Sequence, residues 1–134
     1  YNLIPILTVE ENMTLPLLLD DKKVDRAHFD SLVQVLGLQH RLGHLPSELS
    51  GGQQQRVSIG RALMNNPAIL LADEPTGNLD SKNSKEIVEL LRQFNKALNQ
   101  TVIIITHDER IALDADRVIA VEDGKIVKDE VIRQ

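Results

Sequence analysis

The stretch Ala68–Glu74, with the sequence AILLADE, consists of five apolar residues followed by two acids. A short, uninterrupted apolar run of this kind is typical of a strand that is buried on both faces of a sheet. Two adjacent carboxylates at its carboxyl end are costly to bury unless a cation lies beside them. The stretch therefore predicts a buried strand with a functional edge, although acids that cap the next turn or face solvent would give the same pattern.

Helices and further strands follow this stretch. From about Ser81 an amphipathic pattern predicts a helix, and Val102–Ile105 is β-branched and predicts a second, fully buried strand. A short helix near Asp108–Leu113 leads to a third strand at Val118–Val121, and Asp123-Gly124 predicts a hairpin turn. Apolar strands that alternate with helices predict an α/β fold with a parallel sheet.

The first part of the chain has a different character. An apolar lead-in is followed by Thr8 and Glu11, which have the spacing of a capping box, and Pro16 is expected to kink or end the helix that they start. A second apolar stripe at helical spacing ends at Gly37. We therefore expect a helical subdomain over residues 1–50, followed over residues 51–134 by a further helix and the C-terminal half of an α/β core.

The ends of the two predicted strands carry the candidate catalytic residues. Because strands of a parallel sheet end at the same edge, His107 is expected near Asp73 and Glu74. In that position Asp73 would hold Mg²⁺, Glu74 would polarise an attacking water, and His107 would bind a phosphate oxygen or position the water. A lone histidine is more often a helix cap or an ordinary surface residue, and we assign no role to His28, His40 or His44, which therefore stand outside the candidate site.

A second candidate site precedes the first strand. The segment Leu49–Arg56, LSGGQQQR, places Ser50 as the cap of a helix that opens with Gly51 and Gly52. The unpaired N–H groups and the positive end of the helix dipole favour an anion there, and the two glycines let it approach the backbone. The segment predicts a phosphate-binding helix start, although a Gly-Gly helix start taken alone is more often only a turn.

Taken together and in order, these motifs resemble those of the ATP-binding subunit of ABC transporters. The matching segments are the signature motif at Leu49–Gln53, the Walker B strand at Ile69–Asp73, the D-loop at Gly77–Asp80, the catalytic glutamate Glu74 and the switch histidine His107. The wording of Leu3–Asn12 and Ala72–Asp80 resembles the branch of lipoprotein-release, macrolide-export and antimicrobial-peptide-export ATPases.

This resemblance implies a P-loop ATPase that binds and hydrolyses ATP with Mg²⁺ to power transmembrane export or extraction. It implies a homodimer that sandwiches two ATP molecules, with transmembrane permease subunits as partners, no nucleic acid, and a peripheral position on the cytoplasmic face of the membrane. It assigns catalysis to Glu74 and His107 and the metal to Asp73. It also implies that the region Asn2–Thr14 contacts the permease, although ordinary packing would equally explain the apolar residues of that region. The nucleotide would be contacted by Ser50, Gly51, Gly52, Gln53 and Asp80.

The phosphate loop Gly-x-x-x-x-Gly-Lys-Ser/Thr of this family does not occur in the sequence. The pair Gly124-Lys125 is followed by Ile126 and fails the pattern. We therefore expect the chain to be the C-terminal part of such a subunit, inactive alone, with the phosphate loop and the Q-loop glutamine upstream. The family's phosphate-loop strand would lie between Val102–Ile105 and Val118–Val121, which leaves a gap that a second copy, a rearranged sheet or self-association would fill.

Composition limits the other possibilities. The net charge of −5 argues against a protein that coats nucleic acid, and the absence of cysteine excludes disulfides and thiolate metal sites. No apolar run approaches the ~18–20 residues of a membrane span. Two alternatives stay open: an ABC-type ATPase of DNA repair or the ribosome, and a non-catalytic interaction module.

Overall fold

The computed structural model describes residues 1–133, with helices in the first half and alternating helices and strands in the second. The elements in chain order are α1 (Val9–Leu19), α2 (Arg26–Leu36), the 3₁₀ turn η1 (Pro46–Glu48), α3 (Gly51–Leu63), β1 (Ile69–Asp73), α4 (Ser81–Leu98), β2 (Thr101–Ile105), α5 (Glu109–Leu113), β3 (Arg117–Glu122) and β4 (Lys125–Val131).

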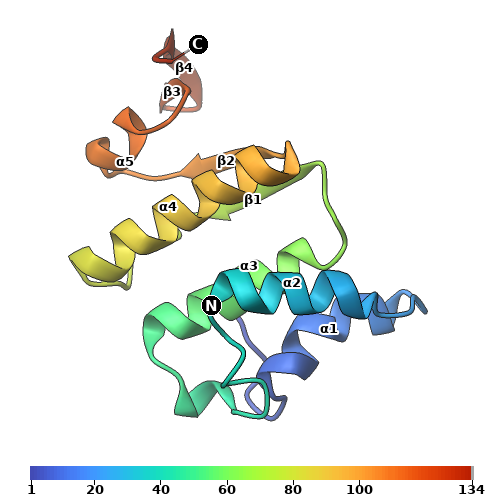
Figure 1. Ribbon diagram of the computed structural model, residues 1–134. Coiled ribbons are helices and arrows are strands. Elements are labelled where there is room, and N and C mark those ends of the chain that lie inside the picture. Colours follow the sequence, from blue (N-terminus) through green and yellow to red (C-terminus); the bar gives the residue numbers. More distant parts are fainter. Residues whose placement is uncertain (134) are drawn as a thin grey trace.

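Helices α1, α2 and α3 pack into one layer, seen at the bottom of Figure 1. The local signals of the sequence explain their ends. Thr8 and Glu11 form the expected capping box at the start of α1, and Gly37 ends α2 in the left-handed conformation. Pro16 does not end α1, which continues to Leu19 and buries Leu17 beyond the proline. The prediction of the helix start is confirmed, and of the two outcomes expected at Pro16, a kink or an end, the helix does not end there.

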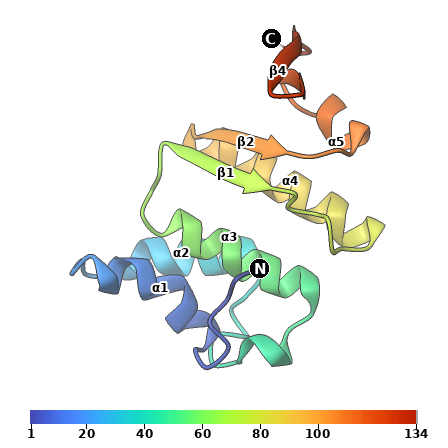
Figure 2. The same ribbon diagram turned by 180° about the vertical axis from the view of Figure 1, so that it is seen from behind.

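Strands β1 and β2 form a parallel pair that lies beside α4 (Figure 2). Their side chains alternate in burial: Leu70 is buried in the core, whereas Leu71 is 72% exposed. The same alternation runs along β2, where Val102 and Ile104 pack against the core and Ile103 is exposed. The prediction that both strands are buried on both faces is therefore wrong for this chain, because its helices cover only one face of the pair.

Strands β3 and β4 form a separate antiparallel hairpin around the expected turn at Asp123-Gly124. Gly124 and Asp123 both have positive φ, as a tight turn of this kind requires. The third predicted strand thus exists, but it does not join the parallel pair: in the part of the chain that the structure describes, no ladder connects β2 to β3. This separation agrees with the expected gap between these two strands.

The hydrophobic core extends from α1 to α4 and draws on both halves of the sequence. Its most deeply buried side chains include Met13, Phe29, Leu36, Leu63 and Leu91. Helix α3 contacts α1 and α2 on one side and α4 on the other, so it joins the helical layer to the strands. A domain boundary near residue 50 stays a prediction. Among the described residues, no helix combines the length and apolar character that crossing a bilayer requires.

Candidate functional site

The carboxyl ends of β1 and β2 lie side by side, because the strands are parallel and Asp73 pairs with Ile105. Glu74, the first residue after β1, donates its backbone N–H to the Ile105 carbonyl at 2.8 Å. Its Oε1 accepts a hydrogen bond from the backbone N–H of His107 at 3.2 Å and lies 2.7 Å from His107 Nδ1. The expectation that Glu74 and His107 meet at this edge is confirmed.

The backbone of Glu74 is unusual. Its φ of 45° lies in the left-handed region, which non-glycine residues rarely adopt. The turn is closed by a hydrogen bond from the Gly77 N–H to the Glu74 carbonyl at 3.1 Å. Strained backbone that the surrounding structure maintains occurs preferentially at functional sites. From this turn the Glu74 carboxylate reaches the residues that follow β2, where Oε1 contacts His107.

The contact with Glu74 also determines the electrostatics of His107. The hydrogen bond that the imidazole makes to the Glu74 carboxylate, followed by the negative charge of Glu74, raises the pKa of His107 above its ordinary value. With Nδ1 facing the carboxylate, Nε2 remains for a further partner, and the His107 side chain is 88% exposed. A raised pKa increases the protonated fraction, in which Nε2 is a donor to an anionic oxygen.

Asp73 ends β1 and is exposed at the same edge. No cluster of three histidine, aspartate or glutamate side chains arranged to hold a metal occurs within residues 1–133. One or two carboxylates at an open edge suit Mg²⁺, which keeps several water ligands and takes others from substrate phosphates. Asp73 therefore fits a magnesium ligand in a nucleotide site and does not fit a metal cage formed by protein alone.

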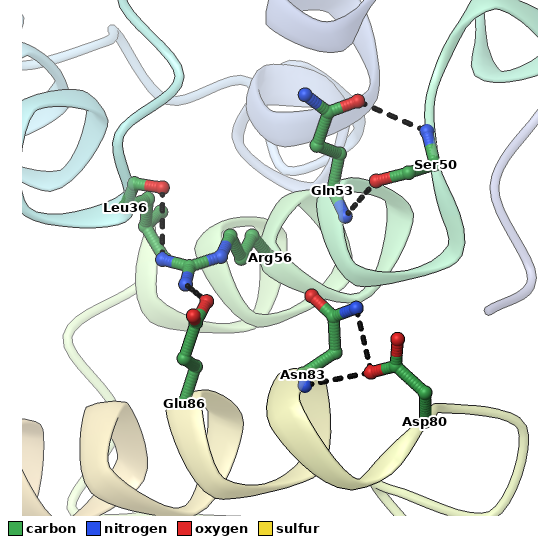
Figure 3. Close-up of polar contacts among 7 residues, drawn as sticks. All are labelled: Leu36, Ser50, Gln53, Arg56, Asp80, Asn83 and Glu86. Atoms are coloured by element: carbon green, nitrogen blue, oxygen red, sulfur yellow. Dashed lines mark hydrogen bonds and ion pairs between the residues drawn. The ribbon is translucent and has the colours of Figure 1, made fainter.

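Ser50 caps α3 as the sequence predicts. Its hydroxyl accepts a hydrogen bond from the Gln53 N–H at 3.2 Å, and the Gln53 side chain accepts one from the Ser50 N–H at 2.9 Å (Figure 3). These two hydrogen bonds use the side-chain amide oxygen and the backbone N–H of Gln53. The backbone N–H groups of Gly51 and Gly52 remain at the positive end of the helix dipole.

The two glycines of this helix start have neighbours where a Cβ would lie. At Gly51 a Cβ would sit 2.8 Å from Tyr1 Oη, and at Gly52 it would sit 2.6 Å from Asn83 Oδ1. Both distances are shorter than real Cβ contacts. Tyr1 Oη ends a flexible side chain that can shift, whereas the Asn83 amide is bonded to Asp80, so the packing reason for glycine is the stronger one at Gly52.

Asp80 caps the start of α4. Its Oδ1 accepts hydrogen bonds from the Asn83 backbone N–H and from Asn83 Nδ2, each at 2.8 Å. These two bonds, the backbone one first, lower the pKa of the Asp80 carboxyl. The carboxylate is therefore held in its charged form, beside the start of α3.

The candidate residues form two groups that no hydrogen bond or ion pair joins within the described chain. Glu74 and His107 form one group, and the helix tip with Asp80 forms the other.

Two surface hollows, one beside His40 and one beside His28, are lined by none of the predicted site residues. Tyr1 and Asn83, which lie beside the two glycines, were not among the residues predicted from the sequence. The spacing of Asp80 and Asn83, at the cap and third position of a helix, was the available signal for Asn83.

Comparison with known proteins identifies the family to which the chain belongs. The family model described as ABC transporter matches residues 1–77, which is more than half of the 134 residues. The chain therefore belongs to the ABC transporter family, and the family expected from the motifs is confirmed.

Two relatives within the family are named for export and for lipoprotein release. The macrolide export ATP-binding/permease protein MacB of Pasteurella multocida (strain Pm70) is 49% identical over 100% of this chain, which covers 21% of MacB. The lipoprotein-releasing system ATP-binding protein LolD of Cytophaga hutchinsonii is 43% identical over 95% of this chain, which covers 59% of LolD. These names are consistent with the expected branch. The chain spans about a fifth of MacB and about three fifths of LolD.

Solved structures agree with the fold class. The dimeric post-hydrolysis state of the ATP-binding cassette MJ0796, bound to ADP and Pi, has a TM-score of 0.82 and 41% identity. The alignment covers 99% of this chain and 60% of that one. A second dimeric structure of the MJ0796 cassette also has a TM-score of 0.82, at 42% identity. The predicted α/β fold of an ABC ATPase is thereby confirmed.

Proposed function

We propose that this chain is part of an ABC subunit that binds and hydrolyses ATP with Mg²⁺ to power transmembrane export or extraction. The observation that carries the proposal is the Glu74–His107 contact at the carboxyl edge of the parallel strands. Family membership and relatives named for macrolide export and lipoprotein release support the transport role.

Glu74 is proposed to activate water. One oxygen of its carboxylate is engaged by His107, so the second oxygen is left to accept a proton from a water beside the terminal phosphate. The strained turn fixes the direction of this carboxylate before substrate arrives, which lowers the reorganisation needed in the transition state.

His107 is proposed to bind the terminal phosphate through Nε2. Its bond to Glu74 orients the ring, and its raised pKa favours the form that donates to a phosphate oxygen. Asp73 would hold Mg²⁺, and this ion neutralises charge on the phosphate oxygens when bound.

The tip of α3 is proposed to complete a second nucleotide site across a dimer. The Gly51 and Gly52 N–H groups, with the Ser50 hydroxyl and the Gln53 side chain, would meet the γ-phosphate bound by the partner, and Asp80 would link the two sites. The dimeric state of the MJ0796 cassette supports a two-subunit arrangement.

We further propose transmembrane permease partners and a peripheral position at the cytoplasmic face of the membrane. The apolar lead-in of this chain supports that contact: Ile6 is 83% exposed, on a loop tied to the buried Asn12 side chain by bonds to Ile4, Leu7 and Thr8. An exposed apolar side chain on a rigidly held loop is suited to a protein contact.

The test is Glu74→Gln in the full-length protein that contains this chain. We expect ATP hydrolysis to fall ~10²–10⁴-fold while MgATP binding is retained, because glutamine keeps the shape and loses the basic oxygen. Steady-state hydrolysis and equilibrium MgATP binding measure the two effects separately.

The control is Glu89→Gln, since Glu89 is an exposed carboxylate on α4 outside the candidate site. The 134-residue chain in the same assay is expected to show no hydrolysis, since its sequence lacks the phosphate-loop pattern. Full hydrolysis by Glu74→Gln would remove Glu74 from the proposed role.

A further inference from the structure

The start of α3 and the start of α4 meet at one side chain. Gly52 is buried, and a Cβ added to it would lie 2.6 Å from Asn83 Oδ1, 3.1 Å from Cγ and 3.6 Å from Cβ. The Asn83 side chain therefore occupies the space that any larger residue at position 52 would need.

The same side chain is bonded on its other side to Asp80. Asn83 Nδ2 donates to Asp80 Oδ1 at 2.8 Å, and Figure 3 shows the amide lying between α3 and the Asp80 carboxylate. Turning the amide away from position 52 would withdraw Nδ2 from Asp80. The space at Gly52 and the Asn83–Asp80 bond are therefore linked.

The two helices are held together nearby, so they do not simply separate to make room. Arg56 on α3 pairs with Glu86 on α4 at 3.0 Å and donates to the Leu36 carbonyl of α2 at 3.3 Å. The Arg56 side chain is only 22% exposed, which limits its freedom to move.

We propose that Asn83 is a positioning residue that couples the phosphate-facing tip of α3 to Asp80 within one subunit. This rests on the proposed function, in which the α3 tip and Asp80 both face the partner subunit. The coupling keeps the Gly51–Gly52 N–H groups and the Asp80 carboxylate in a fixed relation when the dimer closes. Gly52 is required chiefly because Asn83 fills its side-chain space.

The experiment is a double-mutant cycle of Gly52→Ala and Asn83→Ala in the full-length protein. We expect Gly52→Ala alone to lower the Tm by about 4–8 °C, because the added methyl overlaps Asn83. In the Asn83→Ala background the two nearest of these atoms, Oδ1 and Cγ, are gone and Cβ lies at an ordinary 3.6 Å, so we expect Gly52→Ala no longer to lower the Tm. Alanine's higher helix propensity favours a small rise.

The second readout is the dimerisation that MgATP drives, measured in subunits that carry Glu74→Gln. The affinity of the separate subunits for MgATP is measured in the same background. We expect Asn83→Ala to weaken dimerisation about five- to tenfold without changing that affinity, since the lost bond is to a charged group. Asn83→Asp keeps the shape, loses the donor and is expected to weaken dimerisation at least as much. Lys85→Ala, an exposed change on the same helix, is the control.

Three results would overturn the coupling: additive Tm effects of the two substitutions, normal dimerisation of Asn83→Asp, or a Gly52→Ala defect in dimerisation that persists in full without the Asn83 side chain. Loss of MgATP binding or dimerisation by the Glu74→Gln parent would instead overturn the proposed function. In that case the Tm cycle still tests the Gly52–Asn83 contact.

Discussion

Leu36 and Leu71 are the same residue type in two regions of opposite character. Leu36 lies in the helical layer and is 0% exposed, whereas Leu71 lies on the outer face of the parallel pair and is 72% exposed. The outer face also exposes Ile69, Ile103 and Ile105, with Thr101 and Asp73 at its two ends. An apolar stripe at helical spacing was enough to predict which side of a helix is buried. The apolar sequences of β1 and β2 did not by themselves show which face of the strand pair the helices cover.

The candidate residues follow this division. Glu74 and His107 lie at the carboxyl edge of the open strand pair, and the α3 tip belongs to the closed layer. The capping box fixes Ser50 and buried packing surrounds Gly52. Glu74 and His107 are held instead by a turn with positive φ and by hydrogen bonds across the open edge of the strands. The following predictions test that contrast, from the largest expected effect to the smallest.

Leu36→Ala is expected to lower the free energy of unfolding by about 2–5 kcal/mol, because it leaves a cavity in a closed core. Leu71→Ala, the same chemical change on the open face, is expected to alter it by about 0.5 kcal/mol or less. Denaturant unfolding of the 134-residue chain measures both. Equal effects would mean that the two regions do not differ as described.

Repeating Leu71→Ala in a longer protein that contains this chain sharpens the comparison. If the loss of free energy of unfolding in the longer protein rises toward the value for Leu36→Ala, other residues cover the outer face of the strands there. An unchanged small cost would mean that the face stays open in the longer protein.

Gly60→Ala is expected to destabilise the chain by about 1–3 kcal/mol through overpacking. A Cβ at Gly60 would lie 2.7 Å from Met13 Cε and 2.8 Å from Leu36 Cδ1, in the middle of the helical layer. The matched control is Gly43→Ala, since a Cβ at Gly43 meets nothing within 4 Å. Thermal unfolding that gives the two variants the same Tm would contradict the tight packing of α3 on α1 and α2.

The smallest effect concerns the pKa of His107, which NMR titration of the imidazole measures directly. We expect a pKa above the ordinary value of about 6.5, because the ring donates a hydrogen bond to the Glu74 carboxylate, and a return toward that value in Glu74→Gln. Because the folded pKa of His107 is raised, its contact with Glu74 contributes fully to the free energy of unfolding below the unfolded pKa of the imidazole. This contribution is lost as the pH rises through the raised pKa of the folded state. A pKa that Glu74→Gln leaves unchanged would contradict the contact.

Much of the site was predictable because its signals are local or follow from strand direction. Thr8, Ser50 and Asp80 cap helices with side chains three residues or fewer from their partners. Glu74 and His107 could be brought together from the sequence because parallel strands place their carboxyl ends at one edge. Asn83 was missed since its contact with Gly52 joins two helices whose crossing no local pattern encodes.

The sequence alone determined the helices, their caps, the Asp123-Gly124 hairpin, the order of motifs and hence the family, because each depends on neighbouring residues or on a fixed spacing. Only the tertiary structure decided that one face of the strand pair is open, that β3 pairs with β4 apart from β2, and that Asn83 lies between Gly52 and Asp80. These features depend on which surfaces meet, and burial and contact between distant segments are properties of the packed chain rather than of any short stretch of it.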